Sequence, residues 1–374
     1  MPIMNSLKIA ENIAHMRRKK GITQEELASF LGVTKASVSK WENGQSMPDI
    51  LLLPELATYF GISVDELLGY EPQLSREQIQ KLYGELGEDF ATLPFEEAFA
   101  KSEALVKKYY SCYRFLLQIA ILWLNHYVLA EQKERQQEIL VKMRKLCDRI
   151  IEECTDDQIY SDALGIRACI DFCSGRSQDV IDGIAGLLNP QRVLNQSDGV
   201  LIQAYLMNGE PQKADRYAQA STFLHILLAV ANSIYFIGMH IKEREVCEET
   251  IARVDALIRI YHLDELNPNV AANYYFQTAA YYAVHGEDRN CMDRLQMFTE
   301  SGFFLLEKGM LHGDSYFDKL ESWVETLDLG VQMPRSPKLV LQSMRTSLGN
   351  PVFDKIREKS EFKEIERRIK EAKL

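Results

Sequence analysis

Five positions of one short predicted helix carry side chains whose chemistry suits contact with DNA. A lysine ammonium donates hydrogen bonds to guanine acceptors or to phosphate, and an alanine methyl contacts the thymine methyl group. A short helix that presents small, polar and basic groups in this way fits the major groove. The outward positions lie in the sequence TKASVSKWEN and are Lys35, Ala36, Ser37, Ser39 and Lys40.

The residues before this helix predict a second helix that holds it. Thr23 followed three residues later by Glu26 is a capping box, which is typical of a helix N-terminus. Apolar residues then recur at helical spacing and predict a buried face. Gly32 ends the helix, because glycine tolerates left-handed dihedral angles. The buried face consists of Leu27, Ala28 and Leu31.

The outward-facing helix has a cap and an inward face of its own. Thr34 has a side chain that can accept a hydrogen bond from the first turn. Val38 and Trp41 occupy the positions that face inward. The stretch from residue 22 to residue 43 therefore predicts two short helices joined by a tight turn.

The composition favours an all-α protein with more than one domain. The chain has 374 residues, of which 46% are hydrophobic and 26% are charged, as in ordinary globular proteins. A chain of this length supports two or three domains with separate cores. Glycine and proline are few, helix formers dominate, and strand-like alternation is scarce. We expect an N-terminal unit of five helices followed by a larger helical domain.

The net charge of −11 is unusual for a protein that binds nucleic acid, but it is unevenly distributed. Residues 1–70 hold seven Lys and Arg against eight Asp and Glu, whereas the remainder holds 36 against 46. We expect the acidic remainder to stay off DNA, and Lys19 and Lys20 to be solvated. The local positive set that a phosphate backbone requires consists of Arg17, Arg18, Lys19, Lys20, Lys35 and Lys40.

Helix signals divide the chain into four segments. Besides the two helices within residues 22–43, residues 1–69 contain helices predicted over 7–20, 50–60 and 63–69. The last of these begins with a Ser63–Glu66 capping box. Residues 70–76 form a linker, because Pro72 disfavours helix before it and Ser75 with Gln78 begins a new one. The remaining segments are a helical repeat domain over 77–349 and an amphipathic C-terminal helix within 350–374, which either caps the helical stack or forms a partner surface.

Glycines in the second domain predict the turns of helical hairpins. The interval of 34 residues from Gly175 to Gly209 is a known hairpin repeat length, whereas the intervals to Gly238 and Gly286 are 29 and 48 residues. Residues 273–298 and 203–218 resemble tetratricopeptide repeats, although the expected tryptophan is missing. We therefore expect an α-solenoid of tetratricopeptide-like hairpins.

Residues 7–68 resemble the Xre/Cro-type helix-turn-helix domain of phage and bacterial repressors. A generic helical bundle also contains short amphipathic helix pairs, but it does not require the motifs TQEELA and WENG at this separation. The resemblance implies a sequence-specific DNA-binding domain with the fold described above. The matching positions are Arg17, Gly21, 23–28, Gly32, Val33, 37–44, Pro48, Leu56 and Ala57.

The resemblance also implies roles for individual residues. Gln24 and Asn43 match positions that contact phosphate. Arg17 and Glu42 match a buried ion pair that braces the helices, and an arginine fork can satisfy a carboxylate through two hydrogen bonds. The expected DNA-binding set is completed by the capping Thr34, the marginal Ser37, and the base-facing Lys35, Ala36, Ser39 and Lys40.

The two-domain architecture is similar to that of peptide-sensing regulators of the Rgg/PlcR/PrgX kind. That similarity implies a concave groove that binds a short extended peptide, with further contacts that form a homodimer. Amide side chains could pair with a peptide backbone and aromatic rings could line the wall. The simpler interpretation is that each is a satisfied polar residue or part of the core. The candidates are Gln203, Asn232, Tyr235, Asn273 and Phe276.

Other chemistry has little support in the sequence. Cys169 and Cys173 are spaced i, i+4, but no nearby pair completes a zinc site, so buried thiols are the simpler interpretation. We expect no metal, no cofactor and no enzymatic activity, because no phosphate loop or nucleophile elbow occurs. Seven cysteines without a disulfide framework and no signal peptide favour the cytoplasm. The apolar segments 115–130 and 223–240 contain polar residues and predict buried helices rather than membrane spans.

These observations converge on a cytoplasmic transcriptional regulator that binds double-stranded DNA. A homodimer would place its two recognition helices about 34 Å apart on a near-palindromic operator. Its helical domain would sense a small peptide or another effector. Two alternatives stay open: a ligand-independent repressor whose repeats only dimerise, and a scaffold or antitoxin-like protein whose repeats bind a protein partner.

Overall fold

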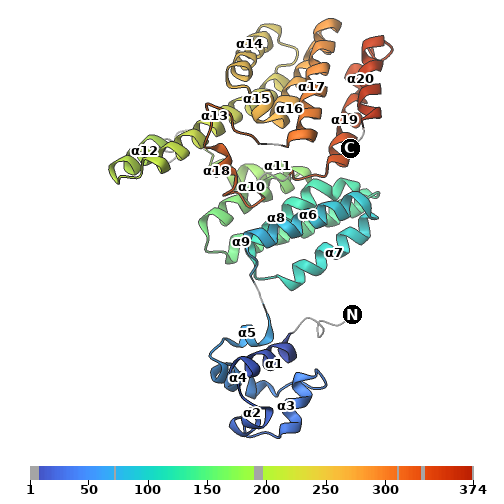
Figure 1. The fold of residues 1–374 in the computed structure, drawn as a ribbon. Coiled ribbons are helices and arrows are strands. Elements are labelled where there is room, and N and C mark those ends of the chain that lie inside the picture. Colours follow the sequence, from blue (N-terminus) through green and yellow to red (C-terminus); the bar gives the residue numbers. More distant parts are fainter. Residues whose placement is uncertain (1–7, 71–72, 189–196, 310, 330–332, 373–374) are drawn as a thin grey trace. The chain divides into compact units, whose positions relative to one another are not determined.

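The computed structural model describes residues 8–70, 73–188, 197–309, 311–329 and 333–372. Every regular element within these ranges is a helix, which confirms the all-α fold class (Figure 1). The chain separates into two units, one of residues 1–74 with 108–112 and one of residues 75–107 with 113–374. Leu7 of the first predicted helix and residues 71–72 of the predicted linker lie outside the described residues.

The N-terminal unit carries the predicted helices with one change. The fourth predicted helix begins as a 3₁₀ turn, η2 (Ile50–Leu52), because Pro54 in the first turn of α4 lacks a backbone N–H. The capping boxes at Thr23 and Ser63 are both present, as predicted. The α-helices among its described residues are α1 (Ile9–Lys19), α2 (Gln24–Phe30), α3 (Lys35–Glu42), α4 (Leu53–Phe60) and α5 (Val64–Leu68).

One hydrophobic core holds these helices together. Leu27 of α2 and Val38 of α3 are fully buried, as their spacing predicted, and Trp41 is nearly so. Burial of side chains of this size contributes roughly 1.5–3 kcal/mol each. Gly32 adopts a left-handed φ of 65°, which lets the chain turn sharply between α2 and α3. The core thus fixes α3 against α2 through the side chains on the inward face of α3.

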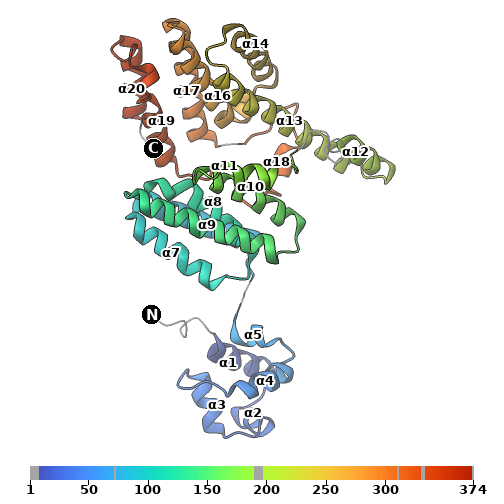
Figure 2. The same ribbon diagram turned by 180° about the vertical axis from the view of Figure 1, so that it is seen from behind.

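The first half of the second unit is a stack of antiparallel helices. Ser75 and Gln78 form the predicted capping box at the start of α6. Helix α8 is buried along most of its length, as expected for its apolar sequence, and packs against α6, α9 and α10 (Figure 2). The helices are α6 (Arg76–Thr92), α7 (Phe95–Lys108), α8 (Tyr113–His126), η3 (Tyr127–Leu129), α9 (Lys133–Glu153), α10 (Asp157–Cys173) and α11 (Ser177–Ile184).

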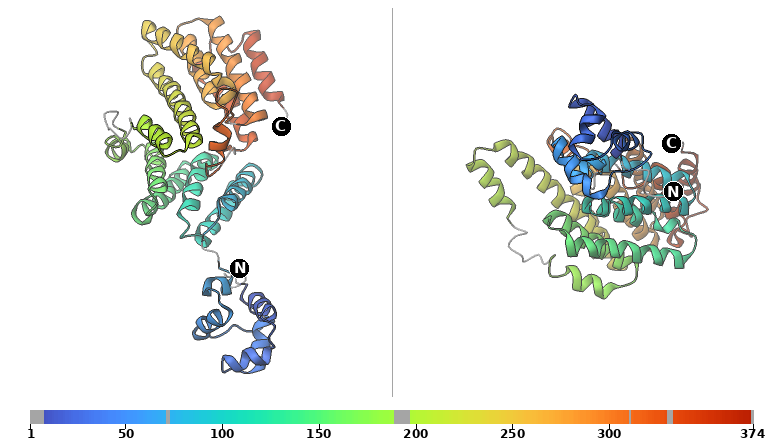
Figure 3. Two further views of the ribbon diagram at one scale, coloured as in Figure 1. Left: turned by 60° about the vertical axis from the view of Figure 1, so that its left-hand side comes forward. Right: turned by 90° about the horizontal axis from the view of Figure 1, so that it is seen from below.

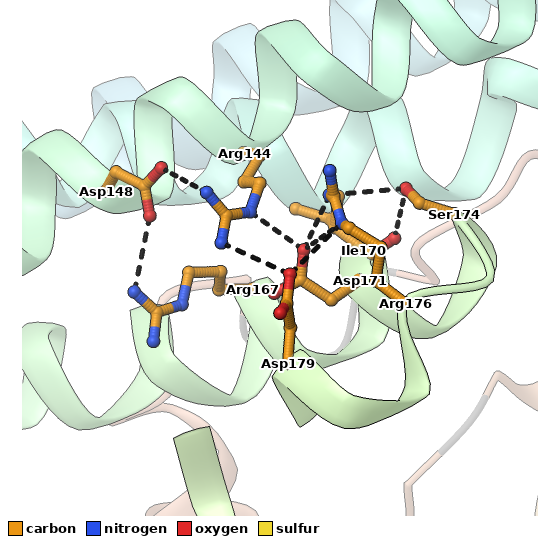
Figure 4. Close-up of polar contacts among 8 residues, drawn as sticks. All are labelled: Arg144, Asp148, Arg167, Ile170, Asp171, Ser174, Arg176 and Asp179. Atoms are coloured by element: carbon orange, nitrogen blue, oxygen red, sulfur yellow. Dashed lines mark hydrogen bonds and ion pairs between the residues drawn. The ribbon is translucent and has the colours of Figure 1, made fainter. Parts of the chain in front are cut away.

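A buried carboxylate joins three of these helices. Asp171 of α10 is 2% exposed, and it accepts hydrogen bonds from Arg144 of α9 at 2.9 Å and from Arg176 at 2.6 Å. Asp179 of α11 pairs with both arginines, as Figure 4 shows. A buried carboxylate is tolerated only where charge and hydrogen bonds compensate its desolvation. These contacts therefore fix how α9, α10 and α11 pack.

The second half of this unit also consists of paired helices. Helices α16 and α17 pack closely along their lengths, and α17 contacts α19 and α20 (Figure 3). Phe362, Ile365 and Ile369 of α20 are buried against this layer. The helices are α12 (Asp198–Met207), α13 (Pro211–Met239), α14 (Arg244–Tyr261), α15 (Leu263–Leu266), α16 (Pro268–Val284), α17 (Asp288–Lys308), α18 (Leu320–Val324), α19 (Pro337–Leu348), η5 (Pro351–Phe353) and α20 (Ser360–Glu371).

Three of the four predicted turn glycines occupy turns. Gly175, Gly209 and Gly286 have φ values of 74°, 73° and 70°, the left-handed region that favours glycine. The prediction for Gly238 was wrong, because this residue lies within the last turn of α13 and the chain turns after it. A glycine inside a helix costs only about 1 kcal/mol relative to alanine, which a helix of 29 residues can accommodate.

Helix α13 carries an exposed apolar stripe. Leu224, Leu228, Tyr235 and Met239 recur at helical spacing and are 39%, 56%, 75% and 72% exposed. The expectation of a buried helix over 223–240 was therefore wrong for this face. By length and composition alone α13 could cross a membrane, and 22% of its apolar window is buried within the protein. The opposite face contacts α14 and α16.

Candidate nucleic-acid interface

Glu42 at the end of α3 connects three helices of the N-terminal unit. Its carboxylate accepts hydrogen bonds from Nε and Nη2 of Arg17, at 2.5 and 3.0 Å, and from Nε2 of Gln24, at 2.8 Å. Arg17 lies in the last turn of α1 and also donates to the carbonyl of Ile22 at 2.8 Å. The side chains of Arg17 and Glu42 are 13% and 5% exposed. The structure thus brings the two expected brace residues together and adds Gln24 to them.

Each member of this ion pair stabilises the charged form of the other. Burial alone would raise the pKa of the Glu42 carboxyl, but the hydrogen bonds from Arg17 and Gln24 lower that pKa overall. The hydrogen bond to Glu42 raises the pKa of Arg17. Both groups are therefore charged at neutral pH, and α3 is held at its C-terminal end by a bidentate, charge-assisted contact.

The outward face of α3 is polar and small. Lys35, Ala36 and Lys40 are exposed, whereas Ser37 and Ser39 are half-buried. The hydroxyl of Thr34 caps α3 by accepting from the N–H of Ser37 at 3.1 Å. At 1.5 Å per residue, the eight residues of α3 extend about 12 Å, which suits a helix lying in the major groove.

Several polar side chains of this surface have partners within the protein. The hydroxyls of Thr34 and Ser37 contact each other at 2.9 Å, and the Asn43 amide lies 3.5 Å from the hydroxyl of Ser39. Gln24 uses one amide hydrogen on Glu42 and keeps the second for another acceptor. These contacts order the side chains on the face that would meet DNA.

The basic residues of the unit differ in how they are held. Lys35 pairs with Glu25 at 3.3 Å in an exposed contact. Such a contact contributes little to stability, so the Lys35 ammonium can readily exchange Glu25 for another anion. Lys40 forms no ion pair with any residue that the structure describes. Lys20 is not simply solvated, as we had expected, because its ammonium donates to the carbonyl of Tyr59 and lies 4.1 Å from the centroid of that ring.

The five candidate effector residues are dispersed. Gln203 lies exposed on α12, and Asn232 and Tyr235 lie exposed on α13. The partly buried ring of Phe276 packs against the core of the second unit, 5.5 Å from the ring of Phe298. Asn273 alone among the five lines the cavity of about 310 Å³ beside α16.

Two polar residues of the second unit escaped the sequence analysis. Asp171 is the buried carboxylate described above, and its position between Ile170 and Phe172 of α10 gives no sequence signal of burial. Arg335 lines the same cavity as Asn273 and precedes α19 in an irregular segment. Neither belongs to a motif, so only the three-dimensional packing identifies them.

The thiols of Cys169 and Cys173 also differ from the expectation. Both side chains are exposed on α10 rather than buried. No group of three or more possible metal ligands occurs among the described residues of the chain.

Comparison with known proteins concerns mainly the N-terminal unit. The helix-turn-helix family model matches residues 13–67. Over 83 residues, or 21% of its length, the chain is 31% identical to the HTH-type transcriptional activator BcrR of Enterococcus faecalis, of which the match covers 41%. Over 60 residues, or 16% of its length, it is 38% identical to the uncharacterized HTH-type transcriptional regulator y4dJ of Sinorhizobium fredii, of which the match covers 78%.

A solved structure extends the comparison beyond this unit. The crystal structure of Bacillus thuringiensis PlcR in complex with the peptide PapR7 and DNA aligns with 80% of this chain and 94% of its own, at 16% identity and a TM-score of 0.30. Because this score is too low to support an inference, family membership rests on the sequence relatives. The match spans less than half the length of the E. faecalis activator.

Proposed function

Because the chain belongs to the helix-turn-helix transcriptional regulators, we propose that it binds double-stranded DNA sequence-specifically through α3. The observation that carries this proposal is the arrangement around Glu42, which fixes α3 against α1 and α2 while leaving Lys35, Ala36 and Lys40 exposed. A rigid helix of this kind can present several side chains to base edges at once. Gln24 and Asn43 flank it at positions suited to phosphate contacts.

Each side chain has a distinct proposed role. Lys35 and Lys40 would donate to guanine acceptors or phosphate, and Ala36 would contact a thymine methyl group. Ser39 would use its hydroxyl on a base, while Thr34 and Ser37 would hold the start of α3 through their mutual hydrogen bond. Arg17 would act only as a brace, since its guanidinium is already occupied by Glu42 and Ile22.

We further propose that the regulator binds as a homodimer to a near-palindromic operator. One α3 reaches only a few base pairs, and two copies related by a two-fold axis would double that contact. The apolar stripe of α13 supports this proposal, since Leu228, Tyr235 and Met239 leave apolar side chains exposed along one face of the helix.

The second unit would act as the sensing domain. Its support is the cavity of about 310 Å³ lined by Asn273 together with Asn125, Asn269 and Arg335. Ligand cavities in proteins begin at about this volume, and polar groups among apolar walls supply specificity. A ligand that prefers one arrangement of the two DNA-binding units would change operator affinity.

Recovery of bound DNA from a random library tests the core of this proposal. The full-length protein should enrich two inverted half-sites whose centres lie about ten base pairs, or one helical turn, apart. A Lys133→Ala control, which removes an exposed charge outside the N-terminal unit, should enrich the same sequence. Failure to enrich any sequence would contradict specific binding, and a single unrepeated half-site would contradict the dimer.

A further inference from the structure

Arg335 is a charged side chain that forms no ion pair with any residue in the described part of the chain. Its Nε atom is buried and makes no hydrogen bond, and its Nη1 atom donates only to the hydroxyl of Ser343 at 3.3 Å. No described carboxylate forms an ion pair with it, although Glu88 lines a neighbouring cavity beside it. Arg335 is half-buried, and a guanidinium that is partly removed from water normally pairs with an anion, because its desolvation is otherwise uncompensated.

The titratable groups around Arg335 do not supply that anion. Its charge influences Tyr83, His126 and Tyr127, all of which are neutral at pH 7. Burial raises the pKa of the Tyr83 hydroxyl and raises that of Tyr127 to about 12. Burial also lowers the pKa of the His126 imidazole. None of these three groups therefore balances the positive charge of Arg335, and Glu88 makes no ion pair with it.

The cavity of about 310 Å³ that Arg335 lines offers complementary groups. The amide of Asn125 donates to the carbonyl of Ile121 at 2.9 Å, and that of Asn273 donates to the carbonyl of Asn269 at 2.8 Å. One hydrogen of each amide is engaged in this way, and the Oδ1 atoms of both asparagines remain as acceptors for N–H groups. The apolar part of the lining includes Ala272, Phe298, Leu305, Val340 and Met344.

We propose that this cavity binds a molecule with a free carboxylate, an adjacent N–H group and an apolar side chain, with Arg335 holding the carboxylate. A planar guanidinium can donate two parallel hydrogen bonds to a carboxylate, which no neutral isostere accepts equally well. An N-acylated amino acid and the C-terminal residue of a peptide share this chemistry. The inference rests on the proposed sensing role of the second unit, but it does not depend on how α3 contacts DNA.

Matched acids and amides test the proposal by calorimetric titration of the full-length protein. The probes are N-acetyl-leucine and acetyl-Ala-Ala-Leu, each as the free acid and as the C-terminal amide. At least one acid should bind about tenfold or more tightly than its amide, as expected for a charge-assisted contact. Binding of the small acid alone identifies an amino-acid ligand, whereas binding of the tripeptide acid identifies a peptide terminus.

Substitutions test whether Arg335 causes the preference for the acid over the amide. Arg335→Gln should abolish the difference between acid and amide, whereas Arg253→Gln, which alters an exposed arginine on α14, should preserve it. Asn273→Leu should weaken acid and amide alike, because it removes an acceptor and not the charge. Since Arg335 lacks a carboxylate partner, Arg335→Gln should not lower the Tm of the ligand-free protein.

Four outcomes would overturn the proposal: no binding of either acid, equal binding of acid and amide, a preference that persists in Arg335→Gln, or a marked loss of Tm in that variant. Operator affinity measured with and without the bound acid separates this inference from the proposed function. Binding of the acid that leaves operator affinity unchanged would support the carboxylate site and contradict the sensing role.

Discussion

Individual residues divide into those that hold α3 and those that it presents. Glu42 is the clearest member of the first group, since it accepts from both Arg17 and Gln24. The pairing of Arg17 with Glu42 followed from the resemblance of the sequence to repressor domains, but the contribution of Gln24 did not. A side-chain amide can donate to phosphate or to a neighbouring carboxylate, and only the structure shows that one hydrogen is already engaged.

Glu42→Ala should destabilise the N-terminal unit by about 3 kcal/mol, because it leaves a largely buried guanidinium without its anion. Native-state hydrogen exchange of residues 24–42 should show the loss as faster exchange of the α2 and α3 amides. Glu55→Ala, at an exposed position of α4, is the control and should leave the exchange rates unchanged. Equal protection in Glu42→Ala and the wild type would contradict the brace.

The same carboxylate predicts a pH dependence. The pKa of Glu42 is lower in the folded protein than in the unfolded chain, so its contribution to stability is complete above the unfolded value of about 4.3. That contribution is lost as the pH falls through the folded pKa. Thermal unfolding of Glu42→Gln should therefore depend less steeply on pH in the acidic range than unfolding of the wild type. Parallel pH profiles would contradict this assignment.

Helices are where the sequence was most informative. Three capping boxes, at Thr23, Ser63 and Ser75, begin helices where local patterns predicted them, because capping depends on residues three apart. The error at Gly238 and the exposed stripe of α13 have another origin. Whether a glycine ends a helix, and which apolar face is covered, depend on neighbours distant in the sequence.

Asp171 provides a test of packing between helices. Asp171→Ala should lower the local stability of α10 and α11 by about 3 kcal/mol, because Arg144 and Arg176 would lose their shared buried anion. Hydrogen exchange over residues 157–184 measures this loss. Glu152→Ala on the exposed face of α9 is a matched control. If both variants exchanged at the wild-type rate, the network would not contribute to the packing.

The whole molecule combines a recognisable DNA-binding unit with a second unit whose role the sequence defines less well. Repeat spacing predicted paired helices there, and the structure contains them. The repeat spacing did not predict the cavity, because Asn125, Asn273 and Arg335 come from segments far apart in the chain. Sites of this kind depend on tertiary packing, which local patterns do not encode.

Assembly of two copies is testable through α13. Tyr235→Glu places a charge at the centre of the exposed apolar stripe and should convert a dimer into a monomer, as measured by light scattering during size-exclusion chromatography. Ile260→Glu is the control, because Ile260 is a 65% exposed apolar residue on α14 rather than on the stripe. A dimer that survives Tyr235→Glu would place the interface elsewhere.

The most direct test of DNA reading by α3 is the ratio of affinities for the selected operator and for unrelated DNA, measured by fluorescence anisotropy at one salt concentration. Lys35→Ala should reduce this ratio by about tenfold, as expected for loss of a base contact. Gln24→Ala should weaken both affinities similarly, because phosphate contacts are independent of sequence. Equal losses on both DNAs for Lys35→Ala would contradict base reading by α3.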